Sequence, residues 1–256
     1  MIRGLYTSAM GMATQMANLD VVANNLANAN TNGFRGGTAV NSSFPEVLMS
    51  RMHAVPGKPT QQVIPVGGVG HGVTIANIHT NFKQGPLERT AGDLDLAIGG
   101  AGFFAVESNI AGTPTEMFTR NGAFTLNAER TLVNHNGDRV LNTSGNHITV
   151  PDGIIEINHA GEIQVNGQLV DTIRIVNFED PTLLRQFGYT LFSQNDAVEI
   201  PFEGSIEQGY LERSNVNVVR EMVHMIKISR AYELNQRMVS IQDITLQQAV
   251  NDIARR

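Results

Sequence analysis

The first 34 residues show a helical repeat of apolar positions. Apolar side chains recur at alternating intervals of three and four residues, which is the a and d pattern of a coiled-coil helix. Continuing the register brings Asn30 and Gly33 to the next two positions, where the sequence TNGF supplies a turn. The pattern therefore predicts one N-terminal helix that ends at this turn. We call its apolar positions the first seam: Ile2, Leu5, Ala9, Met12, Met16, Leu19, Ala23 and Leu26.

A second apolar stripe follows the C-terminal segment, which contains neither Gly nor Pro from Val218 to about Ile253. The stripe falls mostly on one helical face, although Ser229, Arg230 and Glu233 interrupt it. A helix of roughly 35 residues would be about 50 Å long, which is longer than a typical globular helix. The apolar positions are Val219, Met222, Val223, Ile226, Leu234, Met238, Ile241 and Ile244.

The segment between the helices consists of short apolar runs separated by glycine. Asn-Gly pairs begin at residues 121, 136 and 166, and this dipeptide between apolar runs is a strong hairpin signal. The predicted fold class is α+β: two long terminal helices pack together as a coiled-coil-like assembly domain, and the central part of the chain forms a mainly antiparallel β domain. We expect residues 1–35 and 209–256 to form the helical domain, 36–75 an extended connector, and 76–208 the β domain.

The N-terminal helix is rich in residues that disfavour a helix. Gly4 and Gly11 each cost about 1 kcal/mol relative to alanine, and an isolated helix of this length is marginal even with good formers. We therefore expect it to be largely disordered in a lone chain and to fold when a partner covers the seam. The asparagines lie off the seam, which predicts contacts on more than one side: Asn18 and Asn25 at c, Asn24 at b and Asn28 at f.

Composition and charge exclude several classes of protein. Residues 36–208 carry 9 Lys and Arg against 18 Asp and Glu, whereas the two ends carry 9 against 6. No basic stripe with interleaved aromatic residues is present, which argues against nucleic acid as a partner. The chain has no cysteine, no apolar run long enough to span a membrane, and no N-terminal pattern of a cleaved signal peptide.

Candidate catalytic, metal and cofactor motifs are weak. The glycine clusters GGVGHG (67–72) and GGAGFF (99–104) do not match G-x-G-x-x-G or open a helix, so they are interpreted as tight turns. Asp93 and Asp95 are two residues apart, as expected for side chains on the solvent-exposed face of a strand. Ser144 and Ser193 are not in a G-x-S-x-G motif, which is typical of a nucleophilic serine. We predict no enzyme activity, cofactor, metal or small-molecule substrate, since the histidines have no metal-ligand spacing: His53, His71, His79, His135, His147, His159 and His224.

Three motifs closely resemble those of one family, the axial rod and hook proteins of the bacterial flagellum. NLDVVANNLANANTNGFR resembles the N-terminal signature of that family and GYLERSNVNVVREMVHMIKISRAYELNQRMVS the C-terminal one. GPLERTAGDLDLAIGGAGFFAV and FTRNGAF resemble the central segment. One departure is Arg130, where the family often has glycine, and it puts the geometry of one hairpin in question. The length and the connector are most similar to the distal rod component, with the proximal rod proteins as the near alternative.

The resemblance implies a structural subunit that polymerises into the basal-body rod, is exported unfolded by the flagellar type III apparatus and folds on assembly. The implied partners are other copies of the chain, other rod and hook proteins, the export apparatus and rings around the rod. The alternative from another class is a β-rich adhesin or binding module with helical oligomerisation ends. The expected assembly interface comprises Leu5, Met12, Met16, Leu19, Asn24, Asn25, Leu26, Asn28, Gly33, Phe34, Asn215, Asn217, Met222, Ile226, Leu234, Met238 and Ile241.

Overall fold

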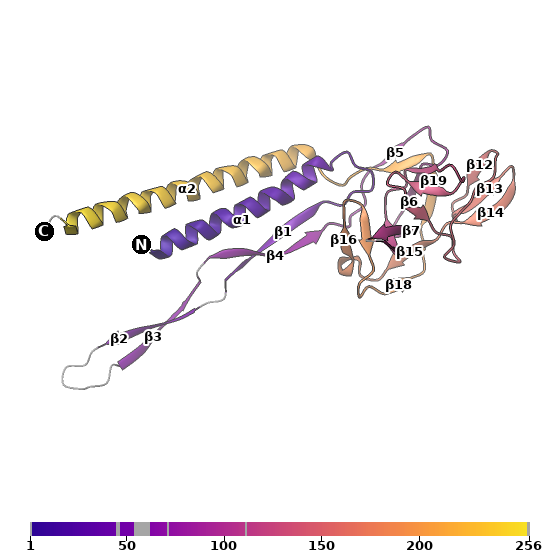
Figure 1. Cartoon of the computed structure of the whole chain (residues 1–256). Coiled ribbons are helices and arrows are strands. Elements are labelled where there is room, and N and C mark those ends of the chain that lie inside the picture. Colours follow the sequence, from indigo (N-terminus) through magenta and orange to yellow (C-terminus); the bar gives the residue numbers. More distant parts are fainter. Residues whose placement is uncertain (1, 45–46, 54–61, 71, 111, 255–256) are drawn as a thin grey trace. The chain divides into compact units, whose positions relative to one another are not determined.

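The computed structural model describes residues 2–44, 47–53, 62–70, 72–110 and 112–254 (Figure 1). The contacts between residues divide the chain into two compact units. The first, which we call the helical unit, contains Met1–Asn24, Gly37–His79 and Val219–Arg256. The second, the β unit, contains Asn25–Gly36 and Thr80–Val218.

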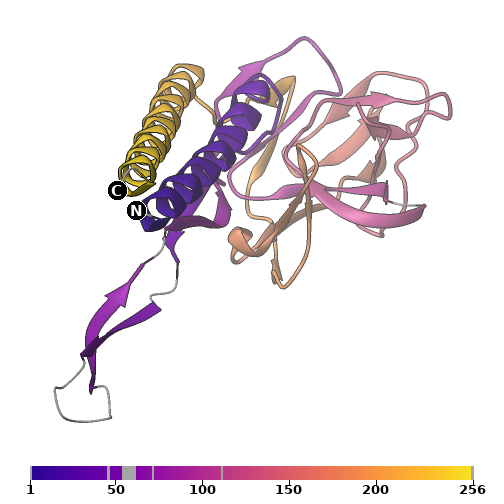
Figure 2. The same cartoon turned by 60° about the vertical axis from the view of Figure 1, so that its left-hand side comes forward.

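The two terminal helices have the predicted positions. α1 spans Ile2–Ala27 and α2 spans Val218–Ala254, and they lie side by side and antiparallel, so that both chain termini are at the same end of the pair (Figures 1 and 2). Both predicted helices are thus confirmed; α2 has the expected bounds to within one residue, whereas α1 ends at Ala27, before the TNGF turn. No helix in the described ranges is both long and apolar enough to cross a membrane.

The described residues of the expected connector, together with the strand that extends beyond it, form two β ribbons, which the prediction of an extended connector did not include. β1 (Gly37–Ser43) pairs with β4 (Val73–Thr80), and β2 (Val47–His53) pairs antiparallel with β3 (Gln62–Val69). The first ribbon runs along α1, where the hydroxyl of Thr14 donates to the carbonyl of Val73 at 2.7 Å (Figure 2). Parts of the expected connector lie outside the described residues, namely 45–46, 54–61 with Pro56 and Pro59, and His71.

The β unit is built on a nine-stranded sheet. Seven strands follow the order β16-β17-β8-β7-β11-β10-β9, β15 also pairs with β7, and β18 pairs with β15. All strand pairs of this sheet are antiparallel. These strands are β7 (Phe103–Ile110), β8 (Thr113–Thr119), β9 (Phe124–Leu126), β10 (Leu132–Asn134), β11 (Arg139–Val140), β15 (Ile175–Phe178), β16 (Arg185–Phe187), β17 (Leu191–Ser193) and β18 (Glu199–Ile200).

Three smaller sheets and a short helix complete the β unit. β12, β13 and β14 form a three-stranded sheet, β19 pairs with β6, and β20 pairs with β5. The bounds are β5 (Leu87–Arg89), β6 (Leu96–Gly99), β12 (Ile155–Ile157), β13 (Glu162–Val165), β14 (Gln168–Thr172), the 3-10 helix η1 (Pro181–Leu183), β19 (Ser205–Gln208) and β20 (Tyr210–Glu212).

The core of the β unit lies on both faces of β7. Side chains alternate along a strand, so Phe104 and Val106 belong to one apolar cluster while Phe103 and Ala105 belong to another. All four are at most 4% exposed. Together with the two helices, this mostly antiparallel β unit confirms the predicted α+β class.

Two of the three Asn-Gly hairpins are confirmed. Asn136 and Gly137 join the paired strands β10 and β11, and Asn166 and Gly167 join β13 and β14 with φ angles of 53° and 77°. The hairpin predicted at Asn121 is wrong, because β8 and β9 do not pair with each other. There the asparagine side chain accepts from the amide of Ala123 and closes a local turn.

The prediction that Asp93 lies on a strand is wrong. It lies in a turn instead of on a strand, since the amide of Asp95 donates to the carbonyl of Gly92. Leu96 is buried, as expected for an inward side chain, and Leu94 is partly buried against the same core. The glycine cluster at 99–104 lies at the end of β6 and the start of β7, with φ angles of 101° at Gly100 and 150° at Gly102.

Candidate functional site

A line of small and polar residues on α1 faces α2. A Cβ added at Gly11 would lie 3.0 Å from the amide nitrogen of Asn235, and one at Gly4 would collide with the amide of Gln242. Glycine therefore lets the two helix backbones approach closely. The residues of this second seam repeat at intervals of four and three: Gly4, Ser8, Gly11, Gln15, Asn18 and Val22.

The two helices contribute very little to the buried apolar core. Of the buried apolar side chains in the described ranges, Val22 alone lies in α1 or α2, whereas nearly all others belong to the β unit. Ser8 and Thr14 are the other buried members of α1 within the helical unit. Because apolar burial supplies most of the stability of a fold, the pair has little intrinsic stability from its own contacts.

α2 has two opposite faces with different surroundings. One repeats half-buried residues at helical spacing and includes the two side chains that meet the glycines of α1: Met225, Ile228, Tyr232, Asn235, Val239 and Gln242. The other is the predicted apolar stripe, which is exposed to solvent. We call it the α2 stripe: Val219 (71% exposed), Met222 (48%), Val223 (44%), Ile226 (54%), Leu234 (62%), Met238 (49%), Ile241 (57%) and Ile244 (51%).

The first seam of α1 is also only partly covered. Leu5, Met12 and Leu19 are half-buried, while Ala9 is exposed and Met16 is 58% exposed. Met16 and Leu19 line an open groove of about 370 Å³ between the helices, opposite Tyr232 and Glu233 of α2. The first seam and the α2 stripe are therefore two separate apolar surfaces on one helix pair.

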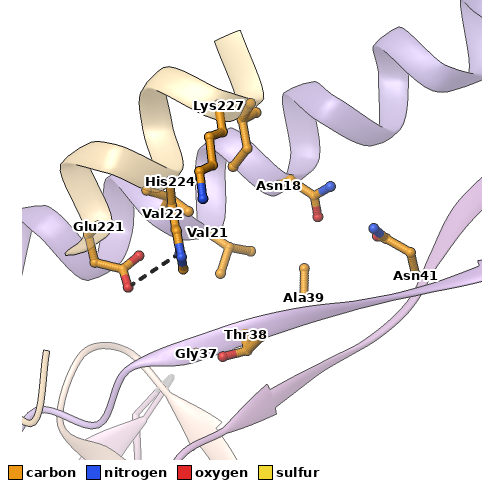
Figure 3. Close-up of a pocket in the computed structure, with 11 residues that line it drawn as sticks. Asn18, Val21, Val22, Gly37, Thr38, Ala39, Asn41, Glu221, His224 and Lys227 are labelled. Carbon is orange, nitrogen blue, oxygen red and sulfur yellow. Dashed lines mark ion pairs between the residues drawn. The ribbon is translucent and has the colours of Figure 1, made fainter. Parts of the chain in front are cut away.

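A second groove, of about 320 Å³, lies between α1, α2 and β1. Figure 3 shows Asn18 of α1 and Asn41 of β1 reaching toward one another along it, with Lys227 of α2 on the opposite wall. His224 lies 4.0 Å from Glu221 on the same helix. The described residues contain no group of three metal-ligating side chains, here or elsewhere.

Several of the residues expected at the assembly interface instead lie inside the β unit. Gly33 and Phe34 are buried, as are Asn25 and Asn28 at 5% and 7% exposure. The amide of Asn215 donates to the carbonyls of Asn81 at 2.7 Å and Lys83 at 2.8 Å, and its oxygen accepts from the backbone of Gly36 at 2.9 Å. These residues therefore make contacts within a single chain. Of the other expected interface residues of this region, Asn24 and Asn217 are exposed and Leu26 is half-buried.

The sequence reasoning missed a buried ion cluster in the β unit. The Glu212 carboxylate lies 2.5 Å from Nη1 of Arg35 through Oε1 and 3.2 Å from Nη1 of Arg120 through Oε2. It also accepts from the backbone amide of Gly85 at 2.8 Å. All three charged residues are at most 4% exposed. The cluster joins the turn after α1 to β20, the last strand before α2.

Further contacts fix Arg120 in place. Its Nη2 donates to the carbonyl of Gly100 at 2.6 Å, and its guanidinium lies 5.3 Å from the ring centroid of Phe103. Burial lowers the pKa of Arg120 to about 10, which the carboxylate of Glu212 partly opposes. The side chain stays cationic at neutral pH, so the cluster holds two cations and one anion.

Each charged residue of this cluster lies in a different one of the sequence motifs. Arg35 ends the motif NLDVVANNLANANTNGFR, Arg120 is in FTRNGAF, and Glu212 is in GYLERSNVN. Charged residues in motifs are more often exposed than buried, so nothing in the separate segments indicated that the three side chains meet. Their meeting is a property of the tertiary fold.

Comparison with known proteins gives a consistent result along the whole chain. Residues 5–35 match the family model described as flagella basal body rod protein. Residues 97–169 match the flagellar hook protein FlgE/F/G D1 domain, and residues 207–252 match the flagellar basal body rod FlgEFG protein C-terminal model.

Relatives of similar length match almost end to end. The flagellar basal-body rod protein FlgG of Agrobacterium fabrum is 36% identical, over 94% of this chain and 96% of the relative. FlgF of Caulobacter vibrioides, also a flagellar basal-body rod protein, is 35% identical over 93% of each chain. FlgG of Borreliella burgdorferi is 34% identical over 95% of this chain and 96% of its own.

The chain has a long helix at each end and an antiparallel β unit in the middle of the sequence, and models of flagellar proteins match both ends and the middle. Together these define an axial protein of the flagellum. The chain belongs to the flagellar basal-body rod FlgE/F/G family, and its full-length relatives favour FlgG, the distal rod protein.

Proposed function

We propose that this protein is a structural subunit of the flagellar basal-body rod, the shaft that transmits torque from the motor to the hook. The observation that carries the proposal is the pair of uncovered apolar surfaces on the helical unit, the first seam and the α2 stripe. Large exposed apolar surfaces are rare on monomers and mark protein contacts. The full-length rod relatives support the same assignment.

The arrangement of the two surfaces favours a polymer over a closed dimer. A dimer with twofold symmetry uses one self-complementary surface, whereas contact between two different surfaces is heterologous and extends into a ring or a helical filament. The first seam and the α2 stripe are on different helices, so contact between them repeats from copy to copy. A rod needs such a contact. The residues on which the proposal relies are Leu5, Met12, Met16, Leu19, Met222, Ile226, Leu234, Met238 and Ile241.

We further infer that the helices fold fully only on assembly, after export of the unfolded chain. The small buried contribution of α1 and α2 supports this order of events, because the neighbouring copies would supply the missing apolar burial. The β unit, with its own core on both faces of β7, would fold first. In this proposal α1 and α2 of the helical unit act as the assembly domain and the β unit as the outer domain.

The proposed partners are other copies of the chain, adjacent rod and hook proteins, the type III export apparatus and rings around the rod. The proposed location of the assembled chain is the basal body, outside the cytoplasm. The role is structural, with no reaction and no cofactor. None of the relatives described above favours an adhesin, because all carry the names of flagellar rod proteins.

Replacing Ile226 by aspartate tests the proposal. The side chain is 54% exposed on the α2 stripe, so a charge there leaves the single chain folded but places an unpaired carboxylate in the contact between copies. We expect loss of rods and motility in cells that make only this variant. Ile154 of the β unit, 72% exposed, gives the control Ile154→Asp, which should assemble. Normal rods with Ile226→Asp would refute the proposed use of this surface.

Limited proteolysis tests the order of folding. Trypsin sites are available along α2 at Arg220, Lys227, Arg230 and Arg237. In the purified monomer these sites should be cut well before Arg120, which is 4% exposed in the β unit. Equal resistance of both regions in the monomer would contradict delayed folding of the helices.

A further inference from the structure

The two uncovered surfaces of the helical unit carry charges of opposite sign. Asp20 is the only acidic residue in the sequence of the first 35 residues, and it is exposed on α1. The middle of the α2 stripe carries two exposed arginines, Arg230 and Arg237, with Glu233 between them. Among the described residues no ion pair is formed by any of these four side chains.

Within one chain Asp20 and Arg230 point away from each other. At about 100° per residue, Asp20 projects from the side of α1 opposite the second seam, which faces α2. By the same geometry Arg230 lies in the α2 stripe, opposite the face that meets α1. The pair can therefore form only between two copies.

We propose that Asp20 of one copy pairs with Arg230 of a neighbouring copy and thereby sets the register of the polymer. This inference rests on the proposed function, because it requires that the first seam of one copy contacts the α2 stripe of the next. Copies related by a helical operation keep the same polarity along the axis. Since α1 and α2 are antiparallel within a chain, α1 of one copy is then antiparallel to α2 of its neighbour.

The apolar residues fit this register. Moving four residues back along α1 and four forward along α2 from the charged pair brings Met16 opposite Leu234. A further heptad brings Ala9 opposite Ile241, and Tyr6 then meets Ile244. The large members of these pairs are all 47–62% exposed in the single chain, so they are available for the contact.

The same register gives Arg237 a suitable neighbour. It lies opposite Ala13, a small residue over which the aliphatic part of an arginine can lie while its charge reaches water. Pairing Asp20 with Arg237 instead would shift the helices by one heptad. Ala9 and Tyr6 would then meet the polar residues Gln248 and Asn251, so the Arg230 register buries more apolar surface.

Charge exchange tests the pair. Asp20→Arg alone and Arg230→Asp alone should each reduce the number of rods at least about tenfold, because each places like charges opposite one another or removes the pair. The double variant Asp20→Arg with Arg230→Asp should restore assembly. Asp20→Arg with Arg237→Asp is the matched control and should not. Normal rods from Asp20→Arg alone, or equal rescue by the control, would overturn the proposal.

Cross-linking provides a second readout that does not depend on a loss of function. The chain has no cysteine, so every disulfide formed must involve the introduced cysteines, and the single variants Met16→Cys and Leu234→Cys control for links between identical positions. Mild oxidation of isolated basal bodies should link Met16→Cys, Leu234→Cys chains into covalent multimers, and the heptad-shifted pair Met16→Cys, Ile241→Cys should give none. Rods without multimers from the first pair would overturn the register and leave the rod proposal intact, whereas absence of the chain from rods would overturn both.

Discussion

Replacing Glu212 by alanine removes the carboxylate that pairs with two buried guanidinium groups. Arg35, Arg120 and Glu212 are each at most 4% exposed, so water cannot replace the lost anion. Breaking a buried pair from one side costs about 3–5 kcal/mol. The amide of Gly85 also loses its acceptor, which adds about 1–3 kcal/mol if no water reaches it. The sum is a large fraction of the 5–15 kcal/mol that stabilises a typical domain.

Equilibrium unfolding in urea, followed by circular dichroism of the β unit, measures this loss. With a slope of about 2–3 kcal/mol per molar urea, the midpoint should fall by at least about 1 M. Glu212→Gln should fall less, because an amide still accepts from Gly85. The matched control is Glu88→Ala, which removes an exposed carboxylate paired with Arg213, the residue that follows the neighbouring strand β20. A midpoint for Glu212→Ala that coincides with that of Glu88→Ala would refute the importance of the cluster.

Three further predictions concern close packing and backbone conformation. Gly11→Leu should separate α1 from α2 and reduce rod assembly, since a side chain there meets Asn235, whereas Thr7→Leu, at an exposed position of α1 away from the first seam, should assemble normally; equal assembly of the two variants would contradict the close approach. Gly33→Ala should lower the melting temperature of the β unit by several degrees, because Gly33 has a φ of 68° and faces the backbone of Arg120; an unchanged melting temperature would contradict this. Arg130 has a φ of 58°, so Arg130→Gly should be about 1 kcal/mol more stable than Arg130→Ala in urea unfolding, and the reverse order would show that its backbone is unstrained.

Arg130 also shows how a departure from a family pattern can be accommodated. Where the family often has glycine, this chain keeps the left-handed backbone and compensates with side-chain contacts. Nε and Nη2 donate to the carbonyls of Val150 and Pro151, both at 2.8 Å, and Nη1 pairs with Asp152. The turn that the substitution put in question is therefore preserved.

The sequence predicted both helices because their periodicity extends over many turns, and periodicity is a local property. It did not predict which helical face would meet the other helix. The contact uses Gly4, Gly11 and polar residues instead of the leucines of the first seam, since close backbone approach and apolar attraction are different ways to pack. An apolar pattern alone could not distinguish a surface used within the chain from one left open for another copy.

The residues proposed for assembly fall into two groups, those predicted from local spacing and those whose contacts depend on the tertiary fold. Met16 and the α2 stripe were predicted from their spacing as parts of an assembly surface, and both are exposed, as the proposal requires. Phe34 and Asn215 were expected at that surface because they belong to the terminal motifs, but they are internal contacts of the β unit. The ion cluster around Glu212 joins residues up to 177 positions apart in the sequence, from Arg35 to Glu212, and no local pattern contains that pairing.

Electron microscopy of isolated basal bodies tests the central claim most directly. An epitope inserted in the exposed turn at Ser144 and Gly145 would mark the β unit without disturbing either helix. The account predicts that antibody decorates the rod at many positions along its axis, and that decoration is lost when Ile226→Asp is combined with the epitope. Decoration confined to another structure, or an unchanged rod without any label, would contradict a rod subunit that assembles through its terminal helices.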